Sequence, residues 1–452
     1  MGFPLNAGCM STQNPIPVGL HALYNICRNV YPSQPNPLQV TAVVKYWLGG
    51  PDPLDYISMY ANAGDAKLNI PPHWHYISFG LSDLHGDGRV HEISGPETQS
   101  GFGFELTFRL KRESGETSPP TWPAAVMQAL AKYVFQSENV LCPGDHVSWH
   151  CSLDNSESRI QHMLMTEDPQ LGTAMTPFGS VTFIQIVGVC AEELKAAQQW
   201  NGPSIIDLMK SVPGAGGPWL VTDMRRGETI FEIDPEIQEA VDDGIATEGS
   251  NLSGVSARCS WSEHNPFNSE NISSESDNNE KKAIDGKSNK SKNLVRNKSD
   301  SSRNSRNSSM SVSHDHNQSN SPMSYTSETG APEPGELLQP RFLNSIHLQL
   351  NLEAGLLLPL ALRGRLKHGR HFTFKNVIGD LAITFVTPSV SGSHVTREHP
   401  YAITGPWLQI LIPDEFIDEI YAELQDLSEV QLPHTYNWPS KNISLTIVAE
   451  EA

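Results

Sequence analysis

Positive charge is scarce in this sequence. Lys and Arg number 31 against 51 Asp and Glu, which leaves a formal net charge of −20. A nucleic-acid-binding protein needs cations to displace the counterions of the phosphates, so this balance argues against direct nucleic-acid binding. An acidic surface favours basic protein partners instead.

Cysteine is also sparse, and the six cysteines of this 452-residue chain form no CxxC pair. Such scatter predicts reduced thiols in an intracellular protein rather than a disulfide framework. The N-terminus lacks a charged segment followed by an apolar signal region, and no apolar run reaches the length of a membrane span. We therefore expect a soluble, intracellular protein with no membrane association.

Motifs of catalysis are missing too. The Gly-rich run at 214–218 lacks the Lys-Ser/Thr ending of a phosphate-binding loop, and no G-x-S-x-G sequence occurs. A metal-dependent hydrolase would need His73, His75, His146 and His150 to converge. Their spacing is not the tight pairing of zinc sites, and seventeen His make chance neighbours common. We expect no enzyme, no metal and no cofactor, and keep the hydrolase as an alternative.

Changes in composition divide the chain into four parts. Residues 1–18 are rich in Pro, Asn and Gly and predict a flexible arm, whereas 19–259 predict one large α/β domain. Residues 260–336 are Ser, Asn and charged residues, which cannot bury enough apolar surface to order, so we expect a disordered acidic insert. Residues 337–452 predict a smaller, β-rich domain. The fold class is therefore α+β, with two mixed α/β domains joined by a long disordered insert.

The first domain contains the cleanest alternation of the chain, at 101–111. Phe and Leu alternate with Glu105, Thr107, Arg109 and Lys111, which predicts a half-buried antiparallel strand. Further predicted helices of this domain lie at 20–30, 124–136, 190–200 and 204–212, and one more begins at Pro235, after Asp234 as N-cap, and is stopped by Gly244. Further strands are predicted at 73–84, 177–190, 216–224 and 228–233.

The second domain predicts a sheet with one covering helix. Strands are expected at 345–352, 356–366, 371–376, 381–387, 405–413 and 441–450, and the helix at 414–427. Basic residues cluster from Arg363 to His371. They are expected to form the solvent-exposed face of a strand pair, and the alternatives are binding of an anionic partner or docking on the acidic N-terminal domain. In the insert, Ser305 and Ser308 each follow Arg-Asn and are candidate phosphorylation sites.

The stretch from Tyr133 to Gln170 holds the densest set of polar groups suited to fixing a ligand. It joins the predicted helix at 124–136 to the strand at 177–190 through a loop rich in acidic and His side chains. From the residues alone, we interpret the chain as a two-lobed binding protein that clamps a ligand between its domains.

Long segments of both domains resemble the Suppressor of fused family. They are LHALYNICRNVYPSQPNPLQVTAVVKYWLGGPDPLDYISMY, HWHYISFGLSDL, SGFGFELTFRLKRE, KYVFQSEN, GDHVSWH, DNSESRIQHMLMTEDPQ, GGPWLVTDMRRGETIFEID, LRGRLKHGRHFTFK and GPWLQIL. The N-terminal arm and the insert do not share the resemblance. Runs of this length are far more specific than a short motif.

The resemblance implies a cytoplasmic and nuclear negative regulator of Hedgehog (smoothened) signalling, which is not an enzyme. It implies binding of GLI/Ci-type zinc-finger transcription factors, their sequestration in the cytoplasm and repression of transcription. The partner's short Ser-Tyr-Gly-His-Leu-Ser segment is expected to be clamped as an extra β-strand between the two domains. Kinases and corepressors of the pathway are further expected partners, and the protein is expected to be a monomer.

The resemblance also implies which residues contact the partner. They are Tyr133, Asp145 and Glu167 of the first domain and Leu357, expected on a strand of the second. Val255, on the segment leading out of the first domain, is a further candidate. The carboxylates can accept charge-assisted hydrogen bonds from the partner's His. The remaining alternative is a scaffold that binds through its disordered insert.

Overall fold

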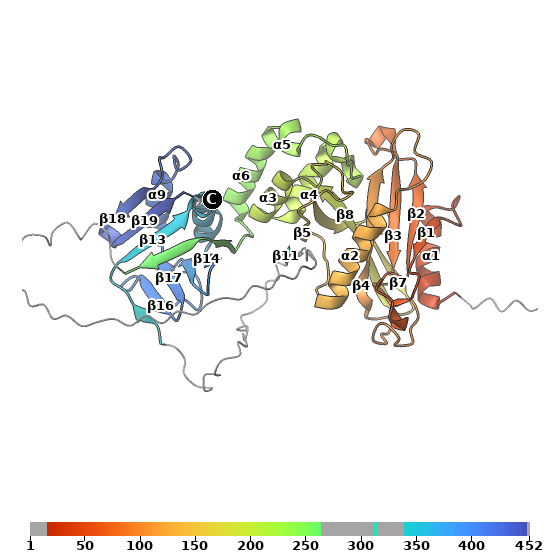
Figure 1. The fold of residues 1–452 in the computed structure, drawn as a ribbon, viewed down its shortest axis with the longest axis horizontal. Helices are drawn as coiled ribbons and strands as arrows, with labels where there is room; N and C mark the ends of the chain where they lie inside the picture. The colour runs from red at the N-terminus through yellow and green to blue at the C-terminus, as the bar shows by residue number, and fades with distance from the viewer. Residues whose placement is uncertain (1–15, 264–310, 314–338, 450–452) are drawn as a thin grey trace, which may run out of the picture. The chain divides into compact units, whose positions relative to one another are not determined.

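The computed structural model describes residues 16–263, 311–313 and 339–449, which fold as two compact units (Figure 1). The N-terminal unit extends to Leu252 and includes the strand at 311–313, and the C-terminal unit begins at Ser253. Both units mix helices with β-sheets, which confirms the predicted fold class. Most of the predicted arm and insert, with Ser305 and Ser308, lies outside the described residues.

The N-terminal unit is built around one sheet. Its α-helices are α1 (Val18–Val30), α2 (Trp122–Ser137), α3 (Ala191–Gln199), α4 (Gly202–Ser211), α5 (Ile230–Ile233) and α6 (Glu236–Glu248). Its strands are β1 (Leu38–Thr41), β2 (Tyr56–Asn62), β3 (His73–Phe79), β4 (Gln99–Lys111), β5 (His146–Ser148), β6 (His162–Glu167), β7 (Thr173–Thr176), β8 (Gly179–Val189) and β11 (Ser311–Ser313). The short 3-10 turns among its described residues are η1 (Tyr46–Leu48), η2 (Ala66–Leu68), η3 (Pro213–Ala215) and η4 (Gly217–Trp219).

Within the described residues the strands of this sheet follow the order β1-β2-β3-β4-β8-β6-β5-β11, with β7 paired to β8. All neighbours are antiparallel except β4 and β8, which run parallel. Helix α1 packs its buried side chains Leu20, Leu23 and Cys27 on one face. Helix α2 covers the opposite face, where Trp122 contacts Phe108 of β4 (Figure 1).

The polar face of strand β4 was predicted to be exposed to solvent, but it is buried. The alternation is real, but the strand lies inside the sheet between β3 and β8 and is buried on both faces. Glu105, Thr107 and Arg109 are fully buried, because they bond to other enclosed polar side chains instead of water. Only Lys111, at the end of the strand, remains partly exposed, as an alternating polar face predicts.

The strands predicted at 216–224 and 228–233 are wrong. Residues Gly217–Trp219 form the 3-10 turn η4, and Ile230–Ile233 form the short helix α5. A capping box explains the second case: the Thr229 hydroxyl accepts from the Glu232 N–H, and the Glu232 carboxylate accepts from the Thr229 N–H at 2.6 Å. This Thr-x-x-Glu spacing was visible in the sequence.

The predicted end of a helix at Gly244 is also wrong, because α6 continues to Glu248 and ends at Gly249, whose φ is +86°. Gly244 has another role. A Cβ atom at this position would lie 2.2 Å from the Trp200 ring, so the missing side chain lets the helix approach the ring.

Replacing Gly244 by alanine should therefore lower the free energy of unfolding by about 1–3 kcal/mol through overpacking, although alanine is the better helix former. Urea unfolding followed by tryptophan fluorescence measures the change. Gly227→Ala is the matched control, because no atom lies within 4 Å of its added Cβ. Equal losses in both variants would mean that the close approach to Trp200 has no energetic weight.

The C-terminal unit has two sheets. Its strands are β9 (Gly254–Ala257), β10 (Cys259–Ser262), β12 (Arg341–Phe342), β13 (Ile346–Asn351), β14 (Phe372–Asn376), β15 (Ala382–Val386), β16 (Tyr401–Thr404), β17 (Trp407–Leu411), β18 (His434–Trp438) and β19 (Ile443–Val448). Its helical segments are α7 (Leu352–Gly355), α8 (Leu358–Leu360), the π-turn η6 (Ala361–Arg365), η7 (Leu366–His368), α9 (Asp414–Glu423) and η8 (Pro439–Lys441). The sheets follow the orders β10-β13-β19-β18 and β12-β16-β17-β15-β14-β9.

The strand predicted at 356–366 is wrong, since this apolar run is helical from α8 through η7. The basic residues Arg363, Arg365 and Lys367 lie on these helical turns and therefore do not form the exposed face of a strand pair. Arg363 stacks on Tyr421 at 3.8 Å, and Lys367 forms an ion pair with Asp418 at 2.5 Å, so both contact the covering helix α9. Arg365 is buried and donates to the backbone oxygen of His371.

The division between the units falls earlier in the chain than the expected boundary at 259. Strand β9 pairs in parallel with β14, and β10 pairs with β13, so residues 254–262 complete the sheets of the C-terminal unit. Helix α6 and β9 are separated by residues 249–253 alone. None of the helices in the described part of the chain is both long and apolar enough to cross a bilayer.

Candidate functional site

Asp145 lies at the turn that leads into β5. Its N–H donates to the Cys142 oxygen at 3.1 Å, and its carboxylate accepts from the Cys142 N–H at 2.7 Å. Its own backbone oxygen accepts from Met165 of β6, and Gly144 donates to the Met165 oxygen. Gly144, with φ +95°, and Asp145 therefore both lie opposite Met165, as in a β-bulge that begins with glycine, directly before the register in which His146 is opposite Leu164.

Glu167 is the last residue of β6 and is exposed. It lies two residues after Met165, so its side chain is on the same face as those of Met165 and Asp145. The Cα atoms of Asp145 and Glu167 are thus diagonal neighbours, about 7–8 Å apart by strand geometry. Two carboxylates at this separation can accept hydrogen bonds from one cationic group between them.

The face that carries both carboxylates is the one that α2 covers. Successive partners across the sheet are Tyr76 opposite Phe108, Phe108 opposite Ile186, and Ile186 opposite Met165. Since Phe108 contacts Trp122 of α2, Met165 and its neighbours share the α2 side. Helices α3 and α4 pack on the other side, against Leu164 and Val187.

A buried polar network holds the end of β6 in place. Asp168, next to Glu167, turns into the opposite face and accepts from Arg109 at 2.9 Å and from the N–H groups of Gln170 and Leu171 at 2.9 Å. His75 Nε2 lies 3.0 Å from the same carboxylate. This network fixes the backbone at Asp168 and so directs Glu167 outwards.

The charges of the network follow from its burial. Burial acts to raise the pKa of Asp168, but His75 and Arg109 outweigh it and the net shift is downward. Burial, together with repulsion from Arg109, lowers the pKa of His75 to about 4 and that of His73 to about 3. At neutral pH the core therefore contains an Arg109–Asp168 ion pair and two neutral imidazoles.

Tyr133 lies in the last turns of α2 and is half-buried. Its hydroxyl accepts from the Asn139 amide at 2.8 Å, just beyond the end of the helix. The connection from this helix to Asp145 is short, because α2 ends at Ser137. Tyr133 therefore lies on the helix that covers the face of both carboxylates, one short connection before Asp145 in the chain.

The two predicted residues of the C-terminal unit lie in different settings. Val255 is half-buried in β9, the last strand of its six-stranded sheet, where it pairs with Phe374 on one side. Leu357 was predicted to lie on a strand, and that prediction is wrong. It lies on the helical turn before α8, with φ −89° and ψ −8°. It is half-buried, and its N–H donates to the Ala354 oxygen.

The histidines considered for a metal site do not converge. His73 and His75 are on β3 and His146 is on β5, with β4, β8 and β6 between them, which is roughly 19 Å at the usual strand spacing. His75 is held by Tyr31 at 2.8 Å and by Asp168. No group of three or more possible metal ligands occurs among the described residues, so the hydrolase alternative has no site there.

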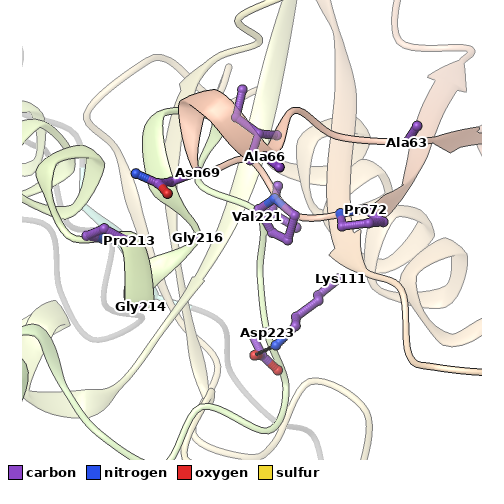
Figure 2. A pocket seen from close by; sticks show the side chains of 12 residues that line it. Ala63, Ala66, Asn69, Pro72, Lys111, Pro213, Gly214, Gly216, Val221 and Asp223 are labelled. Carbon is purple, nitrogen blue, oxygen red and sulfur yellow. Dashed lines mark hydrogen bonds and ion pairs between the residues drawn. The ribbon is translucent and has the colours of Figure 1, made fainter.

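A pocket of about 470 Å³ opens elsewhere in the N-terminal unit, beside the η2 and η3 turns (Figure 2). Proline, glycine and small apolar side chains line most of it. Lys111 and Asp223 point toward one another on its wall and form an ion pair at 2.6 Å (Figure 2). Its single carboxylate is already paired with a cation, and it includes none of the predicted site residues.

The backbone of His146–Ser148 forms an edge strand that the sequence does not predict. Strand β5 is only three residues long and is paired with β6 on one side. On its other side the described chain has one neighbour, β11, which pairs in antiparallel register with Val312 opposite Val147 (Figure 1). The only signal in the sequence was the short alternating run between Gly144 and Cys151, too brief to identify an edge strand.

Comparison with known proteins adds two family models and several close relatives. Residues 50–227 match the model described as Suppressor of fused protein, and residues 239–447 match the Suppressor of Fused Gli/Ci N terminal binding domain. The Suppressor of fused homologs of Homo sapiens and Mus musculus are each 57% identical over 444 residues, covering 96% of this chain and 92% of their own. The crystal structure of Drosophila Suppressor of Fused aligns with a TM-score of 0.70 at 38% identity, covering 96% of this chain and 98% of that one.

Proposed function

This chain belongs to the Suppressor of fused family, and on that premise we propose that it binds GLI/Ci-type transcription factors by accepting an extended peptide as an additional β-strand. The family consists of regulatory binding proteins and not of enzymes. The proposal includes repression of Hedgehog-dependent transcription through cytoplasmic retention of the factor, by a monomeric protein found in the cytoplasm and the nucleus.

The observation that carries the proposal is the outer edge of β5. Apart from the short β11, β5 is the outermost strand at this end of the sheet in the described residues, and the edge of a sheet is where backbone N–H and C=O groups can pair with another chain. This edge already accepts one strand, since β11 pairs with all three residues of β5. Main-chain pairing supplies affinity without depending on sequence, so specificity must come from the side chains around the edge.

Asp145 and Glu167 supply that specificity in the proposal. Both lie on the α2 side, diagonally across β5 and β6, and both are carboxylates in an already acidic protein. A partner segment of the sequence Ser-Tyr-Gly-His-Leu-Ser presents one imidazole. A protonated His between the two carboxylates gains charge-assisted hydrogen bonds, and Tyr133 adds an aromatic contact.

The C-terminal unit contributes a second open edge. Strand β9 pairs with β14 on one side and ends its sheet within the described residues, so Val255 lies where a further strand can pair. Leu357 adds a half-buried apolar side chain. The match of residues 239–447 to a family model for Gli/Ci binding supports a role of this unit in the same interaction.

Titration calorimetry with a synthetic peptide containing Ser-Tyr-Gly-His-Leu-Ser tests the proposal. We expect binding to the wild-type protein and a loss of at least about 30-fold in affinity for Asp145→Arg, because a cation then faces the peptide's His. Asp145→Asn keeps an acceptor for the Cys142 N–H but loses the charge, so a smaller loss of roughly five- to tenfold is expected.

Asp207→Arg is the matched control, since it makes the same change of charge on α4, on the opposite side of the sheet. It should bind the peptide like the wild type. Failure of a folded wild-type protein to bind, or equal losses in Asp145→Arg and Asp207→Arg, would reject the proposed site.

Deleting the insert separates this proposal from the scaffold alternative. Glu263 and Arg341 form an ion pair at 3.0 Å, so the two ends of the described chain at the insert are close within one unit. A short Gly-Ser bridge in place of residues 264–338 therefore leaves β10 and β12 intact. A strand-binding protein retains the peptide after this change, whereas a scaffold that binds through its insert loses it.

A further inference from the structure

We infer that residues Ser311–Ser313 are a built-in competitor that occupies the β5 edge and must leave before another strand binds there. The inference rests on the proposed function, because it concerns the regulation of the same edge. In the observed register, Ser311 is opposite Ser148, Val312 is opposite Val147, and Ser313 is opposite His146.

The edge has room for one strand only. Strand β5 is flanked by residues that turn the backbone: Gly144 has φ +95° before it, and His150 has φ +62° after it. Just beyond the strand, the Trp149 N–H donates to the His162 ring at 3.2 Å, so it is not available to an added strand. Pairing is thus confined to His146–Ser148, and all three residues are used by β11.

Occupancy of this edge excludes a second strand for a simple reason. Each residue of β5 directs its N–H and C=O along the sheet, toward β6 or away from it. The groups that point away from β6 are those that β11 pairs with, and a backbone donor cannot serve two strands at once. An external peptide and β11 therefore compete for the same donors and acceptors.

The length of the pairing sets how strongly the internal strand competes. Strand β11 belongs to the same chain as β5, so it competes at every protein concentration. Three residue pairs give weak pairing, and the edge is then shared between closed and open states. The apparent affinity of an external ligand is its intrinsic affinity multiplied by the fraction of molecules in which β11 has left the edge. We expect this to lower the apparent affinity by roughly two- to tenfold.

Paired prolines at the competing segment test the inference in the full-length protein. Val312→Pro combined with Ser313→Pro removes two adjacent N–H donors. Adjacent residues of a strand direct their N–H groups to opposite sides, so one of the two lost donors is the one that faces β5. Ser301→Pro with Ser302→Pro is the matched control, because it makes the same change in the insert ten residues away from the strand. Unfolding midpoints equal to that of the wild type verify that both variants fold.

Two readouts are needed: calorimetry with the Ser-Tyr-Gly-His-Leu-Ser peptide, and amide exchange at His146–Ser148 without it. The Val312 and Ser313 variant should bind the peptide roughly two- to tenfold more tightly than the wild type and the control. Its His146 and Ser148 amides, which point away from β6, should also exchange faster because the covering strand is lost, whereas the Val147 amide, which points toward β6, should not change.

The outcomes distinguish the inference from the proposed function. Equal affinity and equal exchange in all three proteins would overturn the competitor and leave peptide binding intact. Faster exchange in the variant without peptide binding to any of the proteins would support occupancy of the edge by β11, while the proposed function would fail.

Discussion

Replacing Arg109 by leucine should lower the free energy of unfolding by about 3–5 kcal/mol, because the change leaves Asp168 as a buried charge without its cation. Both side chains are fully enclosed, and the carboxylate oxygens lie 2.9 Å from the guanidinium. The N–H groups of Gln170 and Leu171 remain to solvate the carboxylate but cannot neutralise it. Urea unfolding at pH 8 measures the loss.

The same variant should recover part of its stability in acid. His75 Nε2 is 3.0 Å from Asp168, and repulsion from Arg109 contributes to its lowered pKa. Without the guanidinium, that pKa rises, so an imidazolium can replace the lost cation. Its contribution is present below the new pKa and disappears as pH rises through it, so the loss should be smaller at pH 5 than at pH 8.

Lys111→Met is the control, because Lys111 lies two residues further along β4 and its ion pair with Asp223 is partly exposed. Its loss should stay under about 1 kcal/mol at both pH values. A similar small loss for Arg109→Leu would mean that the buried ion pair contributes little beyond its packing.

Glu105 should make the protein less stable as pH rises from about 4.5 to 7. This carboxyl group is fully buried, and burial raises its pKa from 4.5 to about 7 although Ser78, Gly80 and Ser82 donate to it. Between these pH values the folded chain binds more protons at this group than the unfolded chain, so stability falls with pH. The full shift corresponds to about 3 kcal/mol.

Glu105→Gln isolates this effect from all other titrations. An amide keeps an oxygen for Gly80 and Ser82 and offers an N–H to the Ser78 hydroxyl, but it does not ionise. The difference in unfolding free energy between the variant and the wild type should move by about 2.5 kcal/mol in favour of the variant from pH 5 to pH 8. Parallel pH profiles would show that Glu105 ionises in the folded protein as it does in water.

Hydrophobic periodicity predicted the helices and strands that have one buried face and one exposed face. Two helices of the N-terminal unit lie close to their predicted positions, 20–30 and 124–136. Most predicted strands of the C-terminal unit do so as well. The alternation at 101–111 predicted a strand, but not that Thr107 and Arg109 face an enclosed network. That environment depends on Asp168 and His75, which arrive from β6 and β3, and no local pattern contains them.

Short apolar runs were the main source of error. Residues 356–366 have the composition of a buried strand, yet they turn helically and pack against α9. Periodicity over so short a run does not separate a buried strand from a buried helix. The same ambiguity moved Leu357 from a strand to a helical turn, which changes how its side chain is presented but not its half-buried state.

The candidate site depended on pairing across the sheet. Asp145 and Glu167 were identified as carboxylates able to accept from a His, and the resemblance to a family selected them. Their diagonal relation comes from the β5–β6 register, in which Asp145 and Met165 are opposite. Register is a property of two segments together, so the sequence of either segment alone does not contain it.

The position of β8 has a consequence for synthesis of the chain on the ribosome. Strand β8 follows β1 to β7 in the chain, but in the sheet it lies between β4 and β6. From the end of β4 to the end of β8 the ribosome adds 78 residues (189 − 111), which takes roughly 4–16 s at usual rates of translation. During that interval one edge of β4, flanked by large apolar side chains, has no partner strand. The nascent N-terminal unit is therefore open to strand pairing with other chains at a stage when its finished form, with β8 inserted, is not.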